Sequence, residues 1–198
     1  WKIFACTSSN KVPPSSGKVS YLAVDFLDEN TIDLLVGSLK EEGINVLINN
    51  AGYLYHEEFK KMDLSQAKKM FDINFWGPYQ LIKGLLPNLI TGKGHVVNIG
   101  SMGGFQGSGK FPGLSAYSAS KAALANLTEC LAEELKEDGV VCNCLALGAV
   151  DTEMLKKAFP TYVAGVTPRA MANYIFNFAL NSSQLINGKV LPVSVSTP

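Results

Sequence analysis

The chain has 198 residues, of which 47% are apolar and 17% are charged, against about 25% charged in a typical soluble domain. We therefore expect one compact domain spanning residues 1–198. Seventeen basic and seventeen acidic side chains cancel, and no stretch concentrates one sign, which argues against nucleic acid or an acidic membrane surface as a partner. The sequence contains neither a membrane-spanning run nor a signal peptide pattern, so the predicted location is the cytoplasm.

Cysteine and histidine spacings indicate neither a disulfide framework nor a metal site. The four cysteines form no Cys-x-x-Cys pair: Cys6, Cys130, Cys142 and Cys144. The last two flank one residue in an apolar run, which is typical of a strand core. His56 and His95 have no acidic or thiol partner at a metal-binding spacing, so we interpret both as structural or surface residues.

Short runs rich in Val and Ile alternate with longer helical segments, which is typical of βαβ units and a parallel sheet. The predicted strands are Lys2–Cys6, Val19–Val24, Ile44–Ile48, His95–Ile99, Val140–Ala146 and Lys189–Val193. Four helices are predicted. The first runs from an Asp28 cap to about Lys40 and is closed by Gly43, and the second runs from a capping box of Asp63 and Gln66 to Leu86. The third is Ala116–Glu137, followed by Gly139, and the fourth begins with Thr167 as N-cap and Pro168 as its first residue.

Tyr117 and Lys121 lie four residues apart, so their side chains share one face of a predicted helix. A phenol that works as an acid or base at about pH 7 to 8 needs its pKa lowered by roughly 2 to 3 units. An ammonium group about 4 Å away, at an effective dielectric near 20, contributes about 4 kcal/mol, which is sufficient. An incidental pair on an exposed helix face has the same spacing, so the interpretation depends on the accompanying residues.

Two polar segments follow predicted strands directly, at the edge where ligands bind in open parallel sheets. They are Asn49-Asn50-Ala51-Gly52 and Ser101. Taken alone, the first is also typical of a strand-ending turn and the second of a loop hydroxyl. Ser115 is a rival to Ser101, but it precedes Tyr117 by two residues and is expected to point elsewhere on the helix.

The motifs together resemble the short-chain dehydrogenase/reductase family, in the order Asn49 to Gly52, Asn74, Ser101, Tyr117 with Lys121, and Gly148 with Thr152. The similarity extends over essentially the whole chain. It implies an α/β fold, with a Rossmann-like doubly wound parallel sheet. It also implies hydride transfer between a nicotinamide cofactor and a carbonyl or secondary alcohol.

The resemblance assigns roles to four catalytic residues. Tyr117 is implied as general acid or base, and Lys121 as the residue that lowers its pKa and binds the nicotinamide ribose. Ser101 is implied to orient the substrate oxygen, and Asn74 to hold a water in a proton relay. No metal is required, because proton transfer to the substrate oxygen accompanies hydride transfer to carbon.

Cofactor contacts are implied in three groups: Asp25 and the Phe26 backbone at the adenine; Asn50, Ala51 and Gly52 at the adenosine ribose; and Gly148, Val150 and Thr152 at the nicotinamide and phosphates. Asp25 as a loop acid and Thr152 as a helix cap are the structural alternatives. The segment Cys6–Lys11 offers donors and one cation but no acid, so NADP is favoured over NAD.

The sequence departs from the family pattern in three places. The glycine-rich turn after the first strand is absent, which predicts a fold without its first βα unit and about 25 to 35 residues preceding Trp1. Leu147-Gly148 replaces Pro-Gly, which is expected to free the backbone there. Sixteen positions separate Ser101 from Tyr117, so the loop Phe105–Phe111 is expected to bulge over the site.

An apolar small-molecule carbonyl or alcohol is the predicted substrate, because the expected pocket walls are apolar. They consist of Met102, Phe105, Phe111, Leu114, Met154, Leu155, Phe159 and Tyr162. The helices Leu64–Leu86 and Ala116–Glu137 resemble the pair through which the family dimerises. Close helix approach is permitted by Ala119, Ala122, Ala123 and Ala125, and we expect a homodimer or homotetramer.

Pro78 lies inside a helical pattern, where it cannot donate a hydrogen bond to the carbonyl of Asn74. We expect a kink, with this carbonyl free to hold a water that leads to Lys121. A kink that only wraps the helix around the sheet is the structural alternative. Two other functions compete with the enzyme: a catalytically silent dinucleotide-binding or scaffold homologue, and a flavin-binding domain.

Overall fold

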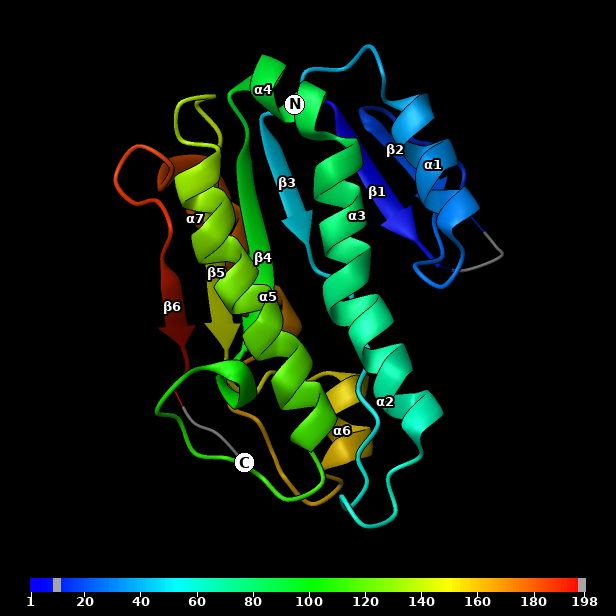
Figure 1. The fold of residues 1–198 in the computed structure, drawn as a ribbon, viewed down its shortest axis with the longest axis vertical. Helices are drawn as coiled ribbons and strands as arrows, with labels where there is room; N and C mark the ends of the chain where they lie inside the picture. The colour runs from blue at the N-terminus through cyan, green and yellow to red at the C-terminus, as the bar shows by residue number, and fades with distance from the viewer. Residues whose placement is uncertain (9–11, 196–198) are drawn as a thin grey trace.

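The computed structural model describes residues 1–8 and 12–195. Its strands run parallel, with helices on both faces (Figure 1). One sheet consists of β1 (Ile3–Thr7) and β2 (Val19–Ala23). The other contains, in order, β3 (Val46–Asn49), β4 (His95–Ser101), β5 (Val141–Leu147) and β6 (Val190–Val193). All six predicted strands are confirmed, with ends displaced by at most two residues.

The helical elements are α1 (Glu29–Ser38), α2 (Leu64–Phe71), the π-helical η1 (Asp72–Trp76), α3 (Gly77–Gly84), α4 (Leu86–Gly92), the 3-10 turn η2 (Met102–Gly104), α5 (Ser115–Glu134), α6 (Glu153–Ala158) and α7 (Pro168–Asn181). Three predicted N-caps are confirmed, because each side chain accepts a hydrogen bond from a backbone N–H of its first turn: Asp28, Asp63 and Thr167.

Three predicted helix features are wrong. The helix after Asp63 does not reach Leu86, because α3 ends at Gly84 and Leu85 separates it from α4; the irregularity expected at Pro78 is present, as a π-helical segment directly before it. Gln66 does not complete a capping box, because its Oε1 accepts a hydrogen bond from the Tyr53 hydroxyl at 2.7 Å. Gly43 does not close the first helix, which ends five residues earlier at Ser38 with Leu39 as its C-cap.

The end of α5 also differs from the prediction. The helix stops at Glu134 instead of Glu137, because the chain turns before entering β5. Gly139 in this turn has a φ of 76°, a left-handed conformation that glycine adopts without strain. The turn leads directly into Val141, the first residue of β5.

Two apolar clusters hold the layers together, one on each face of the β3–β6 sheet. Neighbouring residues of β4 point to opposite faces, so Val96 joins one cluster while Val97 joins the other. The Val96 cluster packs under α1, α3, α4 and the end of α5, and also takes in side chains of β1 and β2. The Val97 cluster packs under α7, which lies behind the sheet in Figure 1.

The two sheets meet at an open edge. Among the described residues, no strand pairs with both β1 and β3. Ile3 on β1 is 47% exposed and Ile48 on β3 is 39% exposed, which is unusual for large aliphatic residues of a parallel sheet. The order β2-β1 followed by β3-β4-β5-β6 is that of a doubly wound fold with its first strand left out. The predicted fold class is confirmed.

Candidate active site

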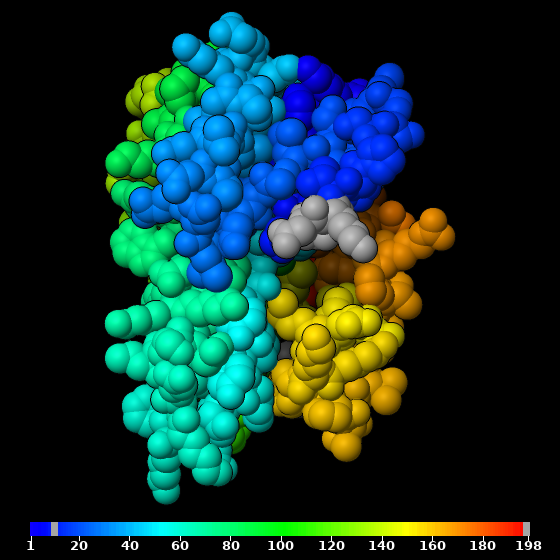
Figure 2. Space-filling model, turned by 90° about the vertical axis from the view of Figure 1, so that its right-hand side faces the viewer, coloured from blue at the N-terminus to red at the C-terminus, as the bar shows by residue number. Residues whose placement is uncertain are grey.

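A cavity of about 290 Å³ lies at the carboxyl ends of β3, β4 and β5. Its walls come from four places: the segment after β3, the end of β4 with η2, the first turns of α5, and the segment from β5 to α6. Figure 2 shows the molecule hollowed between its N-terminal part and α6 on this side. Ligands bind at this edge of open parallel sheets because the strands direct their following loops there.

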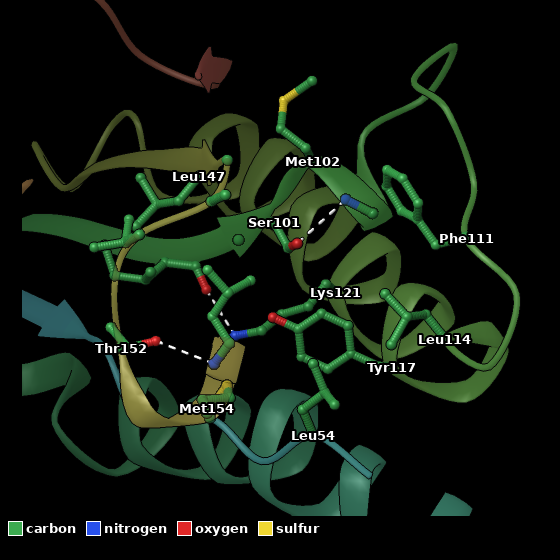
Figure 3. A pocket seen from close by; sticks show the side chains of 18 of the residues that line it. Leu54, Ser101, Met102, Phe111, Leu114, Tyr117, Lys121, Leu147, Thr152 and Met154 are labelled. Atoms are coloured by element: carbon green, nitrogen blue, oxygen red, sulfur yellow. Dashed lines mark hydrogen bonds between the residues drawn. The ribbon is translucent and has the colours of Figure 1, made fainter. Parts of the chain in front are cut away.

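Tyr117 projects from the first turns of α5 into this cavity, with Lys121 beside it (Figure 3). The Ser101 side chain lies beside the Tyr117 hydroxyl. Burial raises the pKa of Tyr117, and the neighbouring Ser101 acts in the opposite direction. Desolvation is the largest cause of this shift, and the expected lowering of the Tyr117 pKa by Lys121 stays a prediction.

Lys121 is 4% exposed and lines the base of the cavity. Its Nζ donates a hydrogen bond to the Ile99 carbonyl of β4 at 2.8 Å. Burial lowers the pKa of Lys121 to about 8, and the nearby Cys144 thiol acts weakly in the opposite direction. The ammonium form therefore predominates at neutral pH but is held in a poorly hydrated place.

Ser101 ends β4, and its hydroxyl lies between the turn and the cavity. The Oγ accepts a hydrogen bond from the Gly103 N–H at 3.2 Å, which fixes the start of η2. Ser101 lines the cavity, whereas Ser115 is exposed and does not. The structure therefore places the predicted hydroxyl, and not its rival, beside Tyr117.

Asn74 is completely buried in η1, and its side chain is fully occupied. Its Oδ1 accepts from the Tyr53 N–H at 2.7 Å, and its Nδ2 donates to the Tyr53 carbonyl and the Ser120 hydroxyl at 2.9 and 3.0 Å. Asn74 does not line the cavity. This side chain braces the segment after β3 by bonding to both backbone polar groups of Tyr53.

Five of the predicted cofactor residues outside α5 line the cavity: Asn50, Gly52, Gly148, Val150 and Thr152. The Thr152 hydroxyl also caps α6, accepting from the Leu155 N–H at 3.3 Å, as the structural alternative anticipated. With Lys121 and Tyr117, these residues form a cradle of one ammonium, two hydroxyls, an amide and two glycines. That donor set fits the ribose and carboxamide of a nicotinamide.

Three predicted cofactor residues lie outside the cavity: Asp25, Phe26 and Ala51. Asp25 is exposed after β2, and its Oδ1 accepts from the Leu27 N–H at 3.0 Å, as a loop acid does. The Phe26 ring packs on Gly77, where an added Cβ would lie 2.6 Å from it. The cofactor-selecting segment Cys6–Lys11 falls partly outside the described residues, since positions 9–11 are not included.

The cavity walls are largely those predicted. Met102, Phe111, Leu114, Met154, Leu155 and Phe159 line it, but Phe105 and Tyr162 do not. Of the loop expected to bulge over the site, only its last residue, Phe111, reaches the cavity. The prediction missed Leu54, which also lines the cavity. The position of Asn49–Gly52 at a strand end could have indicated it, because Leu54 follows two residues later along the carboxyl edge of the sheet.

The predicted effect of Leu147 is wrong. The missing proline was expected to free this backbone, but Leu147 pairs with Val193 of β6. The next N–H, that of Gly148, donates to the Val193 carbonyl at 2.9 Å. Strand pairing therefore fixes the segment that carries Gly148, and Leu147 contributes its side chain to the cavity wall.

The remaining candidate groups are structural. His95 is buried, with Nδ1 on the Ala179 carbonyl at 2.9 Å and Nε2 on the Asn143 amide at 3.1 Å. The four cysteines are free, and Cys142 and Cys144 are buried in β5. Over residues 1–8 and 12–195, no group of three or more His, Cys, Asp or Glu could hold a metal ion. Nor does any helix in those ranges have the length and apolarity to cross a membrane.

The family is settled by comparison with known proteins. Residues 6–163 match the family described as short chain dehydrogenase. The chain belongs to the short-chain dehydrogenase/reductase family. Its members are NAD(P)-dependent oxidoreductases, so the lysine and tyrosine of α5 lie in the setting that the resemblance implied.

Relatives and solved structures agree with this assignment. The chain is 30% identical to 3-oxoacyl-[acyl-carrier-protein] reductase FabG of Chlamydia muridarum, over 90% of this chain and 76% of the relative. It is 37% identical to the mouse dehydrogenase/reductase SDR family member 7B, over 56% of this chain and 34% of the relative. A solved structure of ElxO with NADP bound has a TM-score of 0.77 and 26% identity, covering 89% of this chain and 77% of that one.

The chain is shorter than these proteins. It spans 76%, 46%, 48% and 56% of the length of four curated family relatives. The activity, substrates and partners of the whole protein are therefore taken up as proposals.

Proposed function

We propose that this protein is an NAD(P)-dependent oxidoreductase that interconverts a carbonyl and a secondary alcohol on an apolar small molecule. The observation that carries the proposal is that Tyr117, Ser101 and Lys121 line one cavity, with Ser101 beside the Tyr117 hydroxyl. When bound, the nicotinamide supplies or accepts the hydride.

Tyr117 moves the proton. In reduction its hydroxyl donates a proton to the substrate oxygen as that oxygen gains negative charge, and in oxidation the phenolate takes the proton back. Ser101 donates a hydrogen bond to the same oxygen and fixes its position. The Lys121 ammonium stabilises the phenolate that remains after reduction, because a positive charge is most effective where water is excluded.

Support for an apolar substrate comes from the wall opposite these groups. Phe111 and Phe159 lie edge to face, with ring centroids 6.1 Å apart, and Leu54, Leu114 and Met154 complete an apolar surface. The expected substrates are therefore ketones or aldehydes, and their alcohols, that carry an aliphatic or aromatic group. NADP is the favoured cofactor, as the absence of an acid in Cys6–Lys11 predicts, with NAD as the alternative.

A panel of carbonyls and alcohols, assayed with both cofactors, tests the proposal. Turnover of apolar members, with higher kcat/KM for NADP(H), is the expected result. Turnover with NAD(H) alone would contradict the cofactor preference only.

A catalytically silent homologue is the second candidate, favoured by one observation: the open edge between β1 and β3, beside the place where a dinucleotide would bind. Binding of NADP(H) with no turnover on any member of the panel is the result that would favour it. A homo-oligomer in the cytoplasm remains our proposal for assembly and location.

A further inference from the structure

The turn η2 lies unusually close to α5. A Cβ built on Gly104 would lie 2.7 Å from the backbone nitrogen of Ala122, 2.7 Å from the carbonyl carbon of Lys121 and 2.9 Å from the Lys121 Cβ. Real Cβ atoms essentially never approach other heavy atoms within 3.0 Å. Gly104 has no positive φ, so its backbone conformation alone would admit alanine. Only the missing side chain permits this approach.

The contact lies between the two elements that carry the catalytic groups. Gly104 follows Ser101 by three residues, at the end of the turn that Ser101 itself caps. On the other side, the contact atoms belong to Lys121 and its neighbour in α5. Two contacts join α5 to β4, the strand that leads directly into η2: Lys121 Nζ donates to the Ile99 carbonyl, and Tyr117 lies beside Ser101. Because η2 continues from the end of β4, the distance between η2 and α5 affects both contacts.

We propose that Gly104 is a positioning residue, which holds Lys121 against Ile99 and Tyr117 against Ser101 by letting η2 pack directly on the backbone of α5. The inference rests on the proposed function, since it concerns the geometry of the same reaction. An added methyl group would need about 3.5 to 4 Å from those atoms, and would move the turn and the helix apart by on the order of 1 Å.

Gly104→Ala should lower kcat by roughly 10- to 100-fold, because a displacement of about 1 Å costs that much in a site built for proton transfer. The KM should change less than kcat, because Gly104 does not line the cavity. The pH at which alcohol oxidation reaches half its maximal rate should rise, because a Ser101 hydroxyl farther from Tyr117 lowers the pKa of Tyr117 less.

A second measurement does not depend on activity. The pKa of the buried Lys121 is about 8, so wild-type stability increases with pH above 8. The ionisable groups nearest to it are Tyr117 on its own helix and Cys144 on β5. Opening the contact in Gly104→Ala hydrates Lys121 and should reduce this increase in the free energy of unfolding.

The same loop supplies a matched control. Gly109 also lacks a positive φ, and a Cβ built there would meet nothing within 4 Å. Gly109→Ala should therefore leave kcat, the pH profile and stability unchanged. Gly103→Ala is a milder variant of the same turn, since its Cβ would meet side chains and not the helix backbone: Ser118, with Oγ at 2.9 Å and Cβ at 3.8 Å, and the Ser101 hydroxyl, at 3.6 Å. It should shift kcat in the same direction by a smaller factor.

A double-mutant cycle separates positioning from general stability. In a Lys121→Met background, Gly104→Ala should cause a smaller further loss of kcat than in the wild type, because one of the two groups that it positions is already gone. Three outcomes would each overturn the proposal. They are additive losses of kcat in the double mutant, an unchanged pH profile in Gly104→Ala, and a Gly104→Ala protein that is destabilised but keeps wild-type kcat. If Gly104→Ala does not fold, an unchanged kcat and pH profile in Gly103→Ala would overturn it. Wild-type protein without turnover would contradict the proposed function itself, and the stability measurement would still decide the role of Gly104.

Discussion

The β3–β6 sheet and the β1–β2 unit differ in how completely they are built. Every residue of β4 but the last is buried, and β5 is buried except at its two ends. In β1 and β2, by contrast, every residue of the pair is half-buried or exposed. The proposed catalytic side chains attach to the first region: Ser101 ends β4, and Tyr117 and Lys121 lie on α5. The predicted adenine contacts, Asp25 and Phe26, attach to the second and lie outside the cavity.

The difference indicates that the two tasks of the site depend on different parts of the chain. The proposed proton transfer uses only groups positioned by the continuous sheet and α5, and these groups line one cavity. Holding the far end of a dinucleotide requires β1 and β3 to belong to one continuous sheet, because ligands bind at the carboxyl edge where the strand order reverses. Variants in each region should therefore affect different steps.

The largest expected effect is on the chemical step. Tyr117→Phe removes the titrating hydroxyl and keeps the ring, so kcat should fall by about 10²- to 10⁴-fold while the far-ultraviolet circular dichroism is unchanged. Tyr55→Phe is the matched control, since Tyr55 is exposed in the loop after β3 and does not line the cavity. A Tyr117→Phe variant with near wild-type turnover would remove Tyr117 from the mechanism.

The open edge gives the next prediction. Asn49 ends β3, and its buried Oδ1 has no hydrogen-bond partner among the described residues, while its Nδ2 donates to Asn98 at 2.8 Å. We propose that a strand between β1 and β3, followed by a glycine-rich turn and a helix, supplies the missing donor and a site for the pyrophosphate. A chain carrying about 25 to 35 such residues before Trp1 should bind NADP(H) at least roughly tenfold more tightly than residues 1–198, in line with the effect of a helix N-terminus on an anion.

Isothermal titration of both chains with NADPH measures that difference, and the intact mass of the protein from its source shows whether the segment exists. Equal affinities would contradict the proposed strand. If residues 1–198 bind NADPH tightly without the added segment, the open edge does not limit cofactor binding.

Lys121 gives a smaller effect, on stability. Its pKa is about 10.5 in the unfolded chain and about 8 in the folded protein. Between these values the unfolded chain binds more protons, so the free energy of unfolding should rise from pH 8 to pH 10 by roughly 3 kcal/mol at most. Urea unfolding of Lys121→Met should lack this rise, while Lys157→Met, an exposed control, should retain it. A parallel rise in both variants would contradict the burial effect.

Much of this arrangement was predictable from the sequence, because strand patterns and caps are local. The Asp28, Asp63 and Thr167 caps and the strand ends carrying Asn50 and Ser101 followed from patterns of a few residues. The hydrogen bond of Gln66 could not be predicted from such a pattern. Its partner, Tyr53, comes near only when the segment after β3 folds against α2. The raised pKa of Tyr117 and the occupied side chain of Asn74 likewise depend on burial and on contacts between distant segments.

Assembly should respond to the exposed aromatic residues of the predicted interface helices. Trp76 is 48% exposed and packs against Phe75 and Tyr79, with ring centroids 4.8 and 5.7 Å away. Trp76→Glu should shift the protein from dimer to monomer in light scattering at micromolar concentration, because a charge would be buried in an apolar contact. Phe176→Glu on α7, where Phe176 is 54% exposed, is the control. Wild-type protein that is monomeric under the same conditions would contradict the proposed homo-oligomer.

The smallest expected effect concerns the proton path at Asn74. The π-helical segment places the helix irregularity directly before Pro78, where the Gly77 N–H donates to the Asp72 carbonyl. Because Pro78 has no N–H, it cannot donate to the carbonyl of Asn74 four residues earlier. The Asn74 side chain is occupied by Tyr53 and Ser120. The backbone carbonyl is therefore the atom that we propose holds a water leading from Lys121 towards solvent.

Pro78→Ala tests this by restoring an N–H that can bond to the Asn74 carbonyl and displace such a water. We expect kcat to fall severalfold, with a larger solvent isotope effect, because the proton must take a slower route to solvent. Pro87→Ala is the matched control, since Pro87 occupies the same position in the first turn of α4, away from the cavity. Unchanged kcat and isotope effect in a folded Pro78→Ala protein would mean that Pro78 only shapes the helix, and that protons leave Lys121 by another path.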